Sequence, residues 1–208
     1  MFETSGPRPN PYLRPLFTSD SPVRVAALVG SLREASLNRA LLEAARDLAP
    51  SGLAIEPVEI GDLPFFDADL EARGDPLPVR RLKAAIDAAD ALLIATPEYN
   101  HSLPAVLKNA IDWASRPAPA SPLAGKPVLI MGASAGRSGA KYALAHVAEV
   151  LTHTRMVPFE RRLGVPVAGA LVDADGRLSD EAVRAELAGL LADFAEAVRA
   201  EGSVVVAA

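Results

Sequence analysis

Residues 91–102 read ALLIATPEYNHS, a stretch in which an apolar strand ends abruptly in polar side chains. Five apolar residues and a threonine lead into Pro97. The next five residues then carry a carboxylate, a phenol, an amide, an imidazole and a hydroxyl. A turn alone needs only one or two such groups. This strand is therefore predicted to carry a functional loop at its carboxyl end, and the neighbouring segments indicate what that loop meets.

Apolar strands alternate with amphipathic helices on both sides of this stretch. Strands are predicted at 23–30, 53–60, 91–96, 127–133 and 155–159, and helices at 36–49, 78–90, 103–115, 139–152 and 179–200. Such alternation predicts βαβ units with right-handed crossovers, and hence an α/β fold with a parallel sheet covered on both faces. Pro57 suits an edge strand. Ser36 and Ser179 are the predicted N-caps of the first and last helices, and Pro104 is expected in the first turn of the third.

Composition and charge exclude several classes of function. The 208 residues carry a net charge of −5, which argues against nucleic acid as the main partner, and the absence of cysteine excludes disulfides and thiolate chemistry. No apolar run approaches a membrane span, and no signal-peptide pattern is present, so we expect a soluble cytoplasmic protein. Residues 1–22 hold five of the 18 prolines and are predicted to form a flexible extension before a single domain at 23–208.

No metal site is predicted. His146 and His153 would lie about 10 Å apart along one helix, too far to share an ion directly. The DADG sequence at 173–176 resembles the start of a calcium loop but lacks the later ligands, and is interpreted as a turn.

Three loops are expected to meet at one edge of the sheet, because ligands of such folds bind outside the carboxyl ends of the strands. These loops are GSLREASLN (30–38), PEYNHS (97–102) and GASAGRSG (132–139). The first offers a helix N-terminus, hydroxyls and an arginine to an anion, although it matches neither the dinucleotide fingerprint nor the Walker motif. A capped helix start with an unrelated arginine is the alternative.

The second and third loops also allow more than one interpretation. PEYNHS is either a surface turn whose Tyr99 packs over the core edge, or a cradle for a planar ligand. GASAG at 132–136 matches the nucleophile elbow of serine hydrolases. The histidines that follow Ser134 are His146 and His153, and Glu149 and His153 would lie one turn apart on a single helix. We therefore reject the hydrolase and interpret the loop as a wall that a ligand can approach closely.

With the loops placed, the chain resembles the NADPH-dependent FMN reductases of flavodoxin-like fold, which include bacterial quinone, chromate and azo-dye reductases. ATPEYNHSLPAVLKNAIDW (95–113) is similar to the family's TPEYN-x-S-x-P-G-x-L-K-N-A-I-D-W. GSLREASLN resembles the phosphate loop G-S-x-R-x-x-S-x-N, and 123–136 the fourth strand with its loop. The resemblance implies a three-layer sandwich with a five-stranded parallel sheet in the order 2-1-3-4-5.

The resemblance also implies the chemistry. Hydride from NADPH or NADH would reach bound FMN, and the reduced FMN would pass electrons to a small-molecule acceptor such as a quinone, azo compound, flavin or metal oxyanion. No side chain would be catalytic. The protein would be a dimer or tetramer. The alternative is a non-catalytic FMN carrier. The FMN-binding residues would be Ser31, Arg33, Ser36, Leu37 and Asn38 at the phosphate, Pro97, Glu98, Tyr99 and Asn100 at the isoalloxazine, and Ser134 and Gly136 beside the ring.

Four residues depart from the family pattern. Ala105 stands where glycine is usual. Within 139–151, Ala140, Tyr142 and Leu144 replace a glycine, an arginine and a glutamine of the similar pattern G-G-x-R-A-Q-x-H. This helix start is close to the flavin and to subunit contacts in the family, so these changes bear on acceptor range and assembly.

Overall fold

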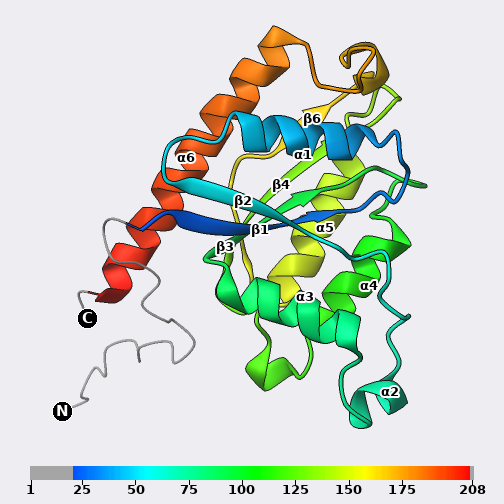
Figure 1. Ribbon diagram of the computed structural model, residues 1–208, viewed down its shortest axis with the longest axis vertical. Coiled ribbons are helices and arrows are strands. Elements are labelled where there is room, and N and C mark those ends of the chain that lie inside the picture. The colour runs from blue at the N-terminus through cyan, green and yellow to red at the C-terminus, as the bar shows by residue number, and fades with distance from the viewer. Residues whose placement is uncertain (1–20, 207–208) are drawn as a thin grey trace, which may run out of the picture.

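A computed structural model describes residues 21–206 and shows one sheet flanked by helices (Figure 1). The strands are β1 (Val23–Val29), β2 (Leu53–Val58), β3 (Ala91–Ala95), β4 (Pro127–Ala133), β5 (Val157–Pro158) and β6 (Leu163–Val165). The helices are α1 (Leu37–Asp47), α2 (Ala68–Ala72), α3 (Leu77–Ala88), α4 (Ala105–Ala114), α5 (Lys141–His153) and α6 (Glu181–Val206), with short 3₁₀ turns η1 (Ala118–Ala120) and η2 (Ala168–Ala170).

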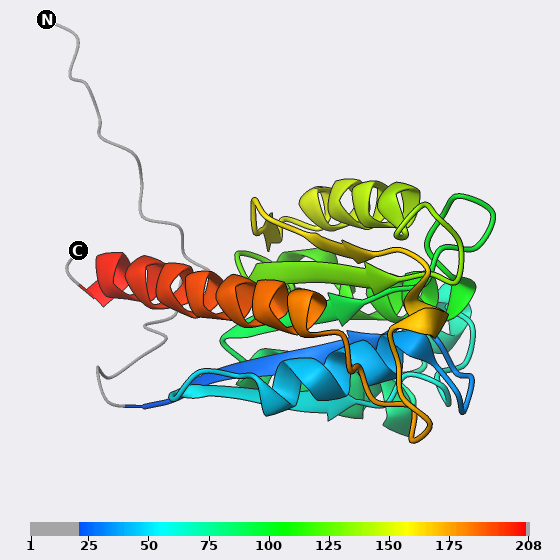
Figure 2. The same cartoon turned by 90° about the horizontal axis from the view of Figure 1, so that it is seen from above.

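The sheet confirms the predicted topology. Its strands are parallel in the order β2-β1-β3-β4-β5, with β2 at one edge as Pro57 suggested. β6 also pairs with β4, beside Met131 to Ala133, whereas β5 pairs with the beginning of β4. The fifth strand is thus divided into two short pieces along one edge. Figure 2 shows the strands pointing the same way, so their carboxyl ends share one side of the molecule.

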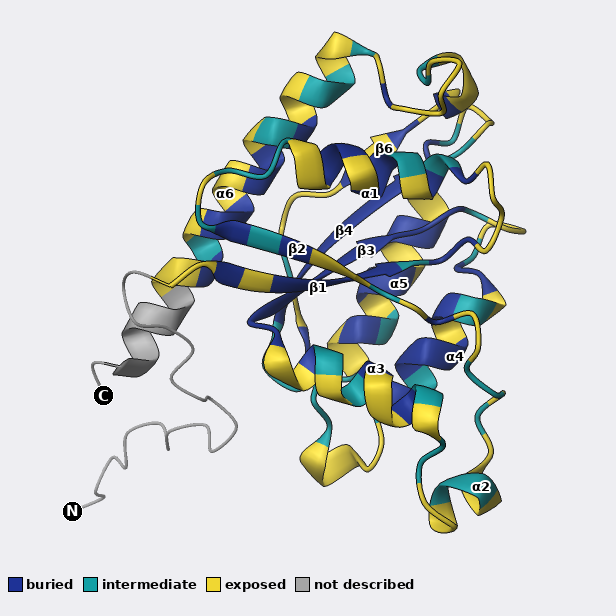
Figure 3. Ribbon diagram, in the orientation of Figure 1, coloured by how far each residue is buried: buried dark blue, intermediate teal, exposed yellow. Residues whose placement is uncertain are grey.

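Two apolar layers hold the helices to the sheet, because successive side chains of a strand point to opposite faces. In β3, Leu93 packs with α1 and α6 on one face, whereas Leu92 and Ile94 pack with α3, α4 and α5 on the other. β3 and β4 are buried at every position, as expected for central parallel strands. Figure 3 shows the buried strands and the exposed outer surfaces of the helices.

Several elements differ from the sequence prediction. α2 and β6 were not predicted, and the single strand expected at 155–159 is the shorter β5. The last helix continues to Val206, beyond the predicted end at residue 200. Its first turn is capped by Asp180, whose Oδ1 accepts the Val183 N–H at 2.9 Å, whereas the Ser179 hydroxyl donates to the Leu171 carbonyl. The Ser179 cap was therefore wrong. Pro104 is the N-cap of α4 and precedes its first turn.

The extension predicted at 1–22 lies outside the described residues except for Ser21 and Pro22. None of the helices in the described part of the chain is long and apolar enough to cross a membrane.

Candidate functional site

The three polar loops meet at the carboxyl edge of the sheet. β3 lies between β1 and β4, so the loops that follow these strands are neighbours (Figure 1). The Gly30 N–H donates to the Ala95 carbonyl at 2.8 Å. A Cβ at Gly30 would lie 2.9 Å from Cγ of Pro104 and 3.2 Å from Cδ of Pro97. Glycine therefore lets the first loop pack directly on the second.

The first loop presents a row of free hydrogen-bond donors. Apart from the turn at residues 34–35, the backbone N–H groups from Ser31 to Asn38 donate to no other described residue. The Ser31 hydroxyl and the Arg33 guanidinium likewise have no partner within the described range. Ser36 caps α1 as predicted, since its hydroxyl accepts the Arg39 N–H at 3.2 Å. Unpaired donors at the positive end of a helix suit a phosphate group.

Asn38 connects the first loop to the third. Its side chain is buried, with Nδ2 donating to the Ala133 carbonyl at 2.9 Å and Oδ1 accepting the Ala133 N–H at 2.8 Å. Both ends of the amide thus bond to the backbone at the end of β4. The structure gives Asn38 a positioning contact between two loops, and direct contact with a phosphate stays a prediction for this residue.

The second loop closes in a tight turn. The N–H groups of Tyr99 and Ser102 each donate to the other residue's carbonyl, at 3.1 and 3.0 Å. The two residues between them have positive φ, 50° at Asn100 and 61° at His101. This pattern is that of a type I′ turn, which asparagine tolerates better than histidine does. Tyr99 is 48% exposed and so is available to a planar ligand.

Glu98 points to the start of α5. Its Oε2 accepts the Tyr142 N–H at 2.8 Å and the Ala143 N–H at 3.3 Å. Partial burial raises the pKa of Glu98, but hydrogen bonds from Tyr142, Ser138 and Ala143, with the charge of His101, outweigh it, so the pKa lies below its ordinary value. Glu98 therefore caps a helix as an anion. Its predicted contact with the isoalloxazine would come in addition to this role.

A pH-dependent test follows from Glu98. Because its folded-state pKa is lowered, the ionised side chain adds stability above its ordinary pKa of 4.5, and this is lost as pH falls through the lower folded value. Glu98→Gln should lower the free energy of unfolding by about 0.5 kcal/mol at neutral pH, a small effect for an accessible charge. Urea titrations from neutral pH to pH 3 should show the two proteins converging in acid. A constant difference at every pH would contradict the assignment.

The third loop is an open wall with no hydrolytic machinery. The Ser134 hydroxyl donates to the Gly136 carbonyl at 3.0 Å, and the Ser134 N–H donates to Val165. His146, one of the two histidines that follow Ser134, instead bonds through Nδ1 to the Ser102 hydroxyl at 2.9 Å. A Cβ at Gly136 would meet nothing within 4 Å. These contacts support the rejection of the nucleophile elbow.

A large groove adjoins the first loop and includes Ser36 and Leu37, but its charge suits a phosphate less well than the donors at 31–38 do. This groove, of about 1250 Å³, lies between α1 and the segment 172–184. Six carboxylates line it against three arginines: Glu34, Glu43, Asp47, Asp173, Asp175 and Glu181 with Arg39, Arg177 and Arg184. This surplus of negative charge disfavours a phosphate. No group of three or more His, Cys, Asp or Glu side chains in the described part of the chain could hold a metal ion.

The parallel sheet and its helices define a flavodoxin-like protein, and comparison with known proteins identifies the family. Residues 23–169 match the profile of NADPH-dependent FMN reductase. The chain belongs to this family. It is therefore an oxidoreductase that uses FMN with NAD(P)H.

Individual relatives agree with this assignment. An NAD(P)H-dependent FMN reductase of Pseudomonas aeruginosa is 45% identical over 163 residues, which cover 78% of this chain and 88% of the relative. A quinone reductase of Escherichia coli is 35% identical over 181 residues, covering 85% and 96%. The solved structure of FerB, a flavoenzyme NAD(P)H:acceptor oxidoreductase from Paracoccus denitrificans, superposes with a TM-score of 0.78 at 38% identity, covering 85% and 97%.

The family resemblance placed the start of α5 near the flavin, but sequence reasoning missed its contacts with the second loop. Tyr142 stacks on His101, and His146 bonds to Ser102, so one face of α5 contacts the second loop. Tyr142 and His146 are four residues apart, the spacing of neighbours on a helix face. That spacing was visible in the sequence, but nothing in it indicated which loop the pair would meet.

Proposed function

We propose that this protein reduces a small planar acceptor of quinone type with NADPH or NADH, using FMN held by the three loops. The supporting observation is that unpaired N–H donors at 31–38, which suit a phosphate, lie at the same edge of the sheet as the half-exposed Tyr99. Relatives named quinone reductases and a 2-hydroxy-1,4-benzoquinone reductase favour this acceptor class. Azo compounds, free flavin and metal oxyanions are the other classes that the family resemblance implied.

Each loop has a separate task in this proposal. Ser31, Arg33 and the backbone up to Leu37 hold the phosphate, with Ser36 fixing the helix start. The segment from Pro97 to Asn100 holds the ring, and the open backbone from Ser134 to Gly136 borders it. Bound FMN supplies the hydride and electron chemistry, so the protein needs to bind, orient and exclude water. The proposal therefore assigns no catalytic side chain.

Acceptor specificity can be measured directly. Initial rates with NADPH should be compared across a benzoquinone, a neutral azo dye, free FMN and chromate, at matched concentrations. The proposal predicts the highest kcat/KM for the benzoquinone. A higher kcat/KM for chromate or the azo dye would overturn the quinone assignment while leaving the family membership intact. NADH in place of NADPH in the same assay would establish the donor preference.

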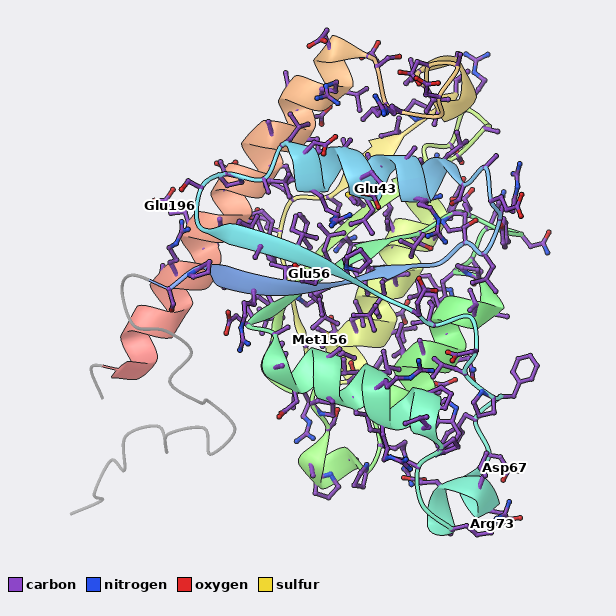
Figure 4. The ribbon with its side chains drawn as sticks, viewed as in Figure 1. Glu43, Glu56, Asp67, Arg73, Met156 and Glu196 are labelled. Atoms are coloured by element: carbon purple, nitrogen blue, oxygen red, sulfur yellow. The ribbon has the colours of Figure 1, made fainter. Side chains whose placement is uncertain are left out.

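Arg33 provides a test of the phosphate site. Arg33→Ala should weaken FMN binding by about tenfold or more, because a charge-assisted contact to the phosphate is lost. The measurement is a titration of cofactor-free protein with FMN, followed by flavin fluorescence. Arg73→Ala is the matched control, since it removes the same charge from the end of α2, well away from α1 (Figure 4). Equal affinities in the two variants would refute the role of Arg33. Riboflavin, which lacks the phosphate, should bind both variants alike.

Assembly and location remain predictions. A dimer or tetramer is expected, and sedimentation of the purified protein would establish its mass. The proposed location is the cytoplasm, where NADPH and NADH are supplied. The family is one of enzymes, which speaks against the alternative of a passive FMN carrier.

A further inference from the structure

The turn after β3 is strained and needs outside support. Asn100 and His101 both have positive φ, and a histidine in this region costs about 1 kcal/mol or more relative to ordinary backbone. The turn is closed by the two backbone hydrogen bonds between Tyr99 and Ser102. An isolated bridge of this size is weak in water. Contacts from another element must therefore help to keep the turn in place.

Those contacts come from the start of α5. Glu98 accepts hydrogen bonds from the first turn of the helix, and the Ser102 hydroxyl lies 2.9 Å from Nδ1 of His146. Between them, the His101 ring stacks on the Tyr142 ring, with centroids 4.4 Å apart and planes inclined by 14°. The Lys141 ammonium lies 4.8 Å from the centre of the same tyrosine ring. The strained residue of the turn is thus the one whose side chain is stacked.

The two members of this stack stand at different kinds of position in the family pattern. His101 occupies the variable position of the TPEYN-x-S motif, and Tyr142 stands where the family pattern has arginine. Tyr142 also remains 44% exposed, so the stack lies at the surface beside the loop edge. A core-packing role alone would not explain an exposed aromatic pair on a strained turn.

We propose that His101 and Tyr142 form an aromatic clasp that holds the turn 99–102 against α5 and so positions the segment 97–100 for the flavin ring. The clasp residues are positioning residues, because they act through the turn. A stacked pair of this kind is worth a factor of about 2 to 10 in an equilibrium constant. The inference rests on the placement of the flavin ring proposed above.

A double-mutant cycle on FMN affinity tests the clasp. His101→Ala removes the ring and keeps the cost of a Cβ at positive φ, and Tyr142→Ala removes the partner ring while keeping the backbone N–H that Glu98 accepts. Each variant should weaken FMN binding by about 2- to 10-fold, and the double variant by about the same factor as either single one. Tyr142→Phe keeps the stack and should retain parental affinity.

Hydrogen exchange in the cofactor-free protein provides a readout that is independent of the flavin. The Ser102 amide, which donates to the Tyr99 carbonyl, should exchange about 2 to 10 times faster in His101→Ala and Tyr142→Ala and at the parental rate in Tyr142→Phe. Additive losses of FMN affinity would overturn the clasp, as would a Tyr142→Phe variant as impaired as Tyr142→Ala. Faster exchange with unchanged FMN affinity would overturn the positioning role. Failure of the parent protein to bind FMN would instead refute the proposed flavin placement.

Discussion

Replacing Gly132 with alanine is expected to lower the free energy of unfolding by about 3 kcal/mol or more, because β4 has no room for a side chain there. A Cβ at this position would lie 2.6 Å from the Thr96 carbonyl oxygen and 2.9 Å from Cβ of Ala140. The first of these atoms belongs to the backbone after β3, which cannot move without breaking its pairing with β4. The Thr96 N–H, for instance, donates to the Met131 carbonyl at 2.9 Å. The clash therefore separates the two strands that carry the second and third loops.

Chemical denaturation of the cofactor-free protein measures this effect. Gly136→Ala is the matched control, since the same substitution four residues later meets nothing within 4 Å. The control should unfold within about 0.5 kcal/mol of the parent, as expected for a surface substitution. Similar stabilities for the two variants would show that the end of β4 is less tightly packed than the structure indicates.

Asn38→Ala is expected to cost about 3 kcal/mol, because it leaves two buried backbone groups without partners. The amide of Asn38 bonds to both the N–H and the carbonyl of Ala133, and Asn38 is 2% exposed. Each buried group left unpaired costs about 1–3 kcal/mol. FMN affinity should fall as well, since the link between the first and third loops is lost.

The neighbouring Arg39→Ala serves as the control for Asn38, because Arg39 is an exposed residue on the same turn of α1. We expect it to leave the free energy of unfolding nearly unchanged. Asn38→Asp adds a further comparison, since it keeps an acceptor for the Ala133 N–H but loses the donor and buries a charge. If Asn38→Ala were as stable as Arg39→Ala, the bonds to Ala133 would not hold the loops together.

Much of the fold could be predicted from the pattern of apolar residues. β4 has the predicted bounds, 127–133, because a central parallel strand is continuously apolar. β6 could not be found in this way, since it has three residues and contains Gly164. α2 was missed for a related reason, as none of its five residues is buried and no hydrophobic period marks it.

The site was predicted at the level of loops but less well at the level of contacts. The rule that ligands bind at the carboxyl ends of parallel strands placed all three loops together. Asn38 and Glu98, however, bond to Ala133 and to the start of α5, 95 and 44 residues away in the sequence. Such distant partners leave no local pattern. The His101–Tyr142 stack could not be predicted for the same reason.

The central claim is that the loop edge binds FMN and that the protein reduces it with NADPH. The most direct measurement is to saturate purified protein with FMN, remove the excess, and mix it with NADPH under argon while following visible flavin absorbance. We predict a stoichiometric flavin content and rapid, complete loss of the absorbance, followed by its recovery when a benzoquinone is added. A protein that retains no FMN, or a bound flavin whose absorbance NADPH does not change, would contradict the claim.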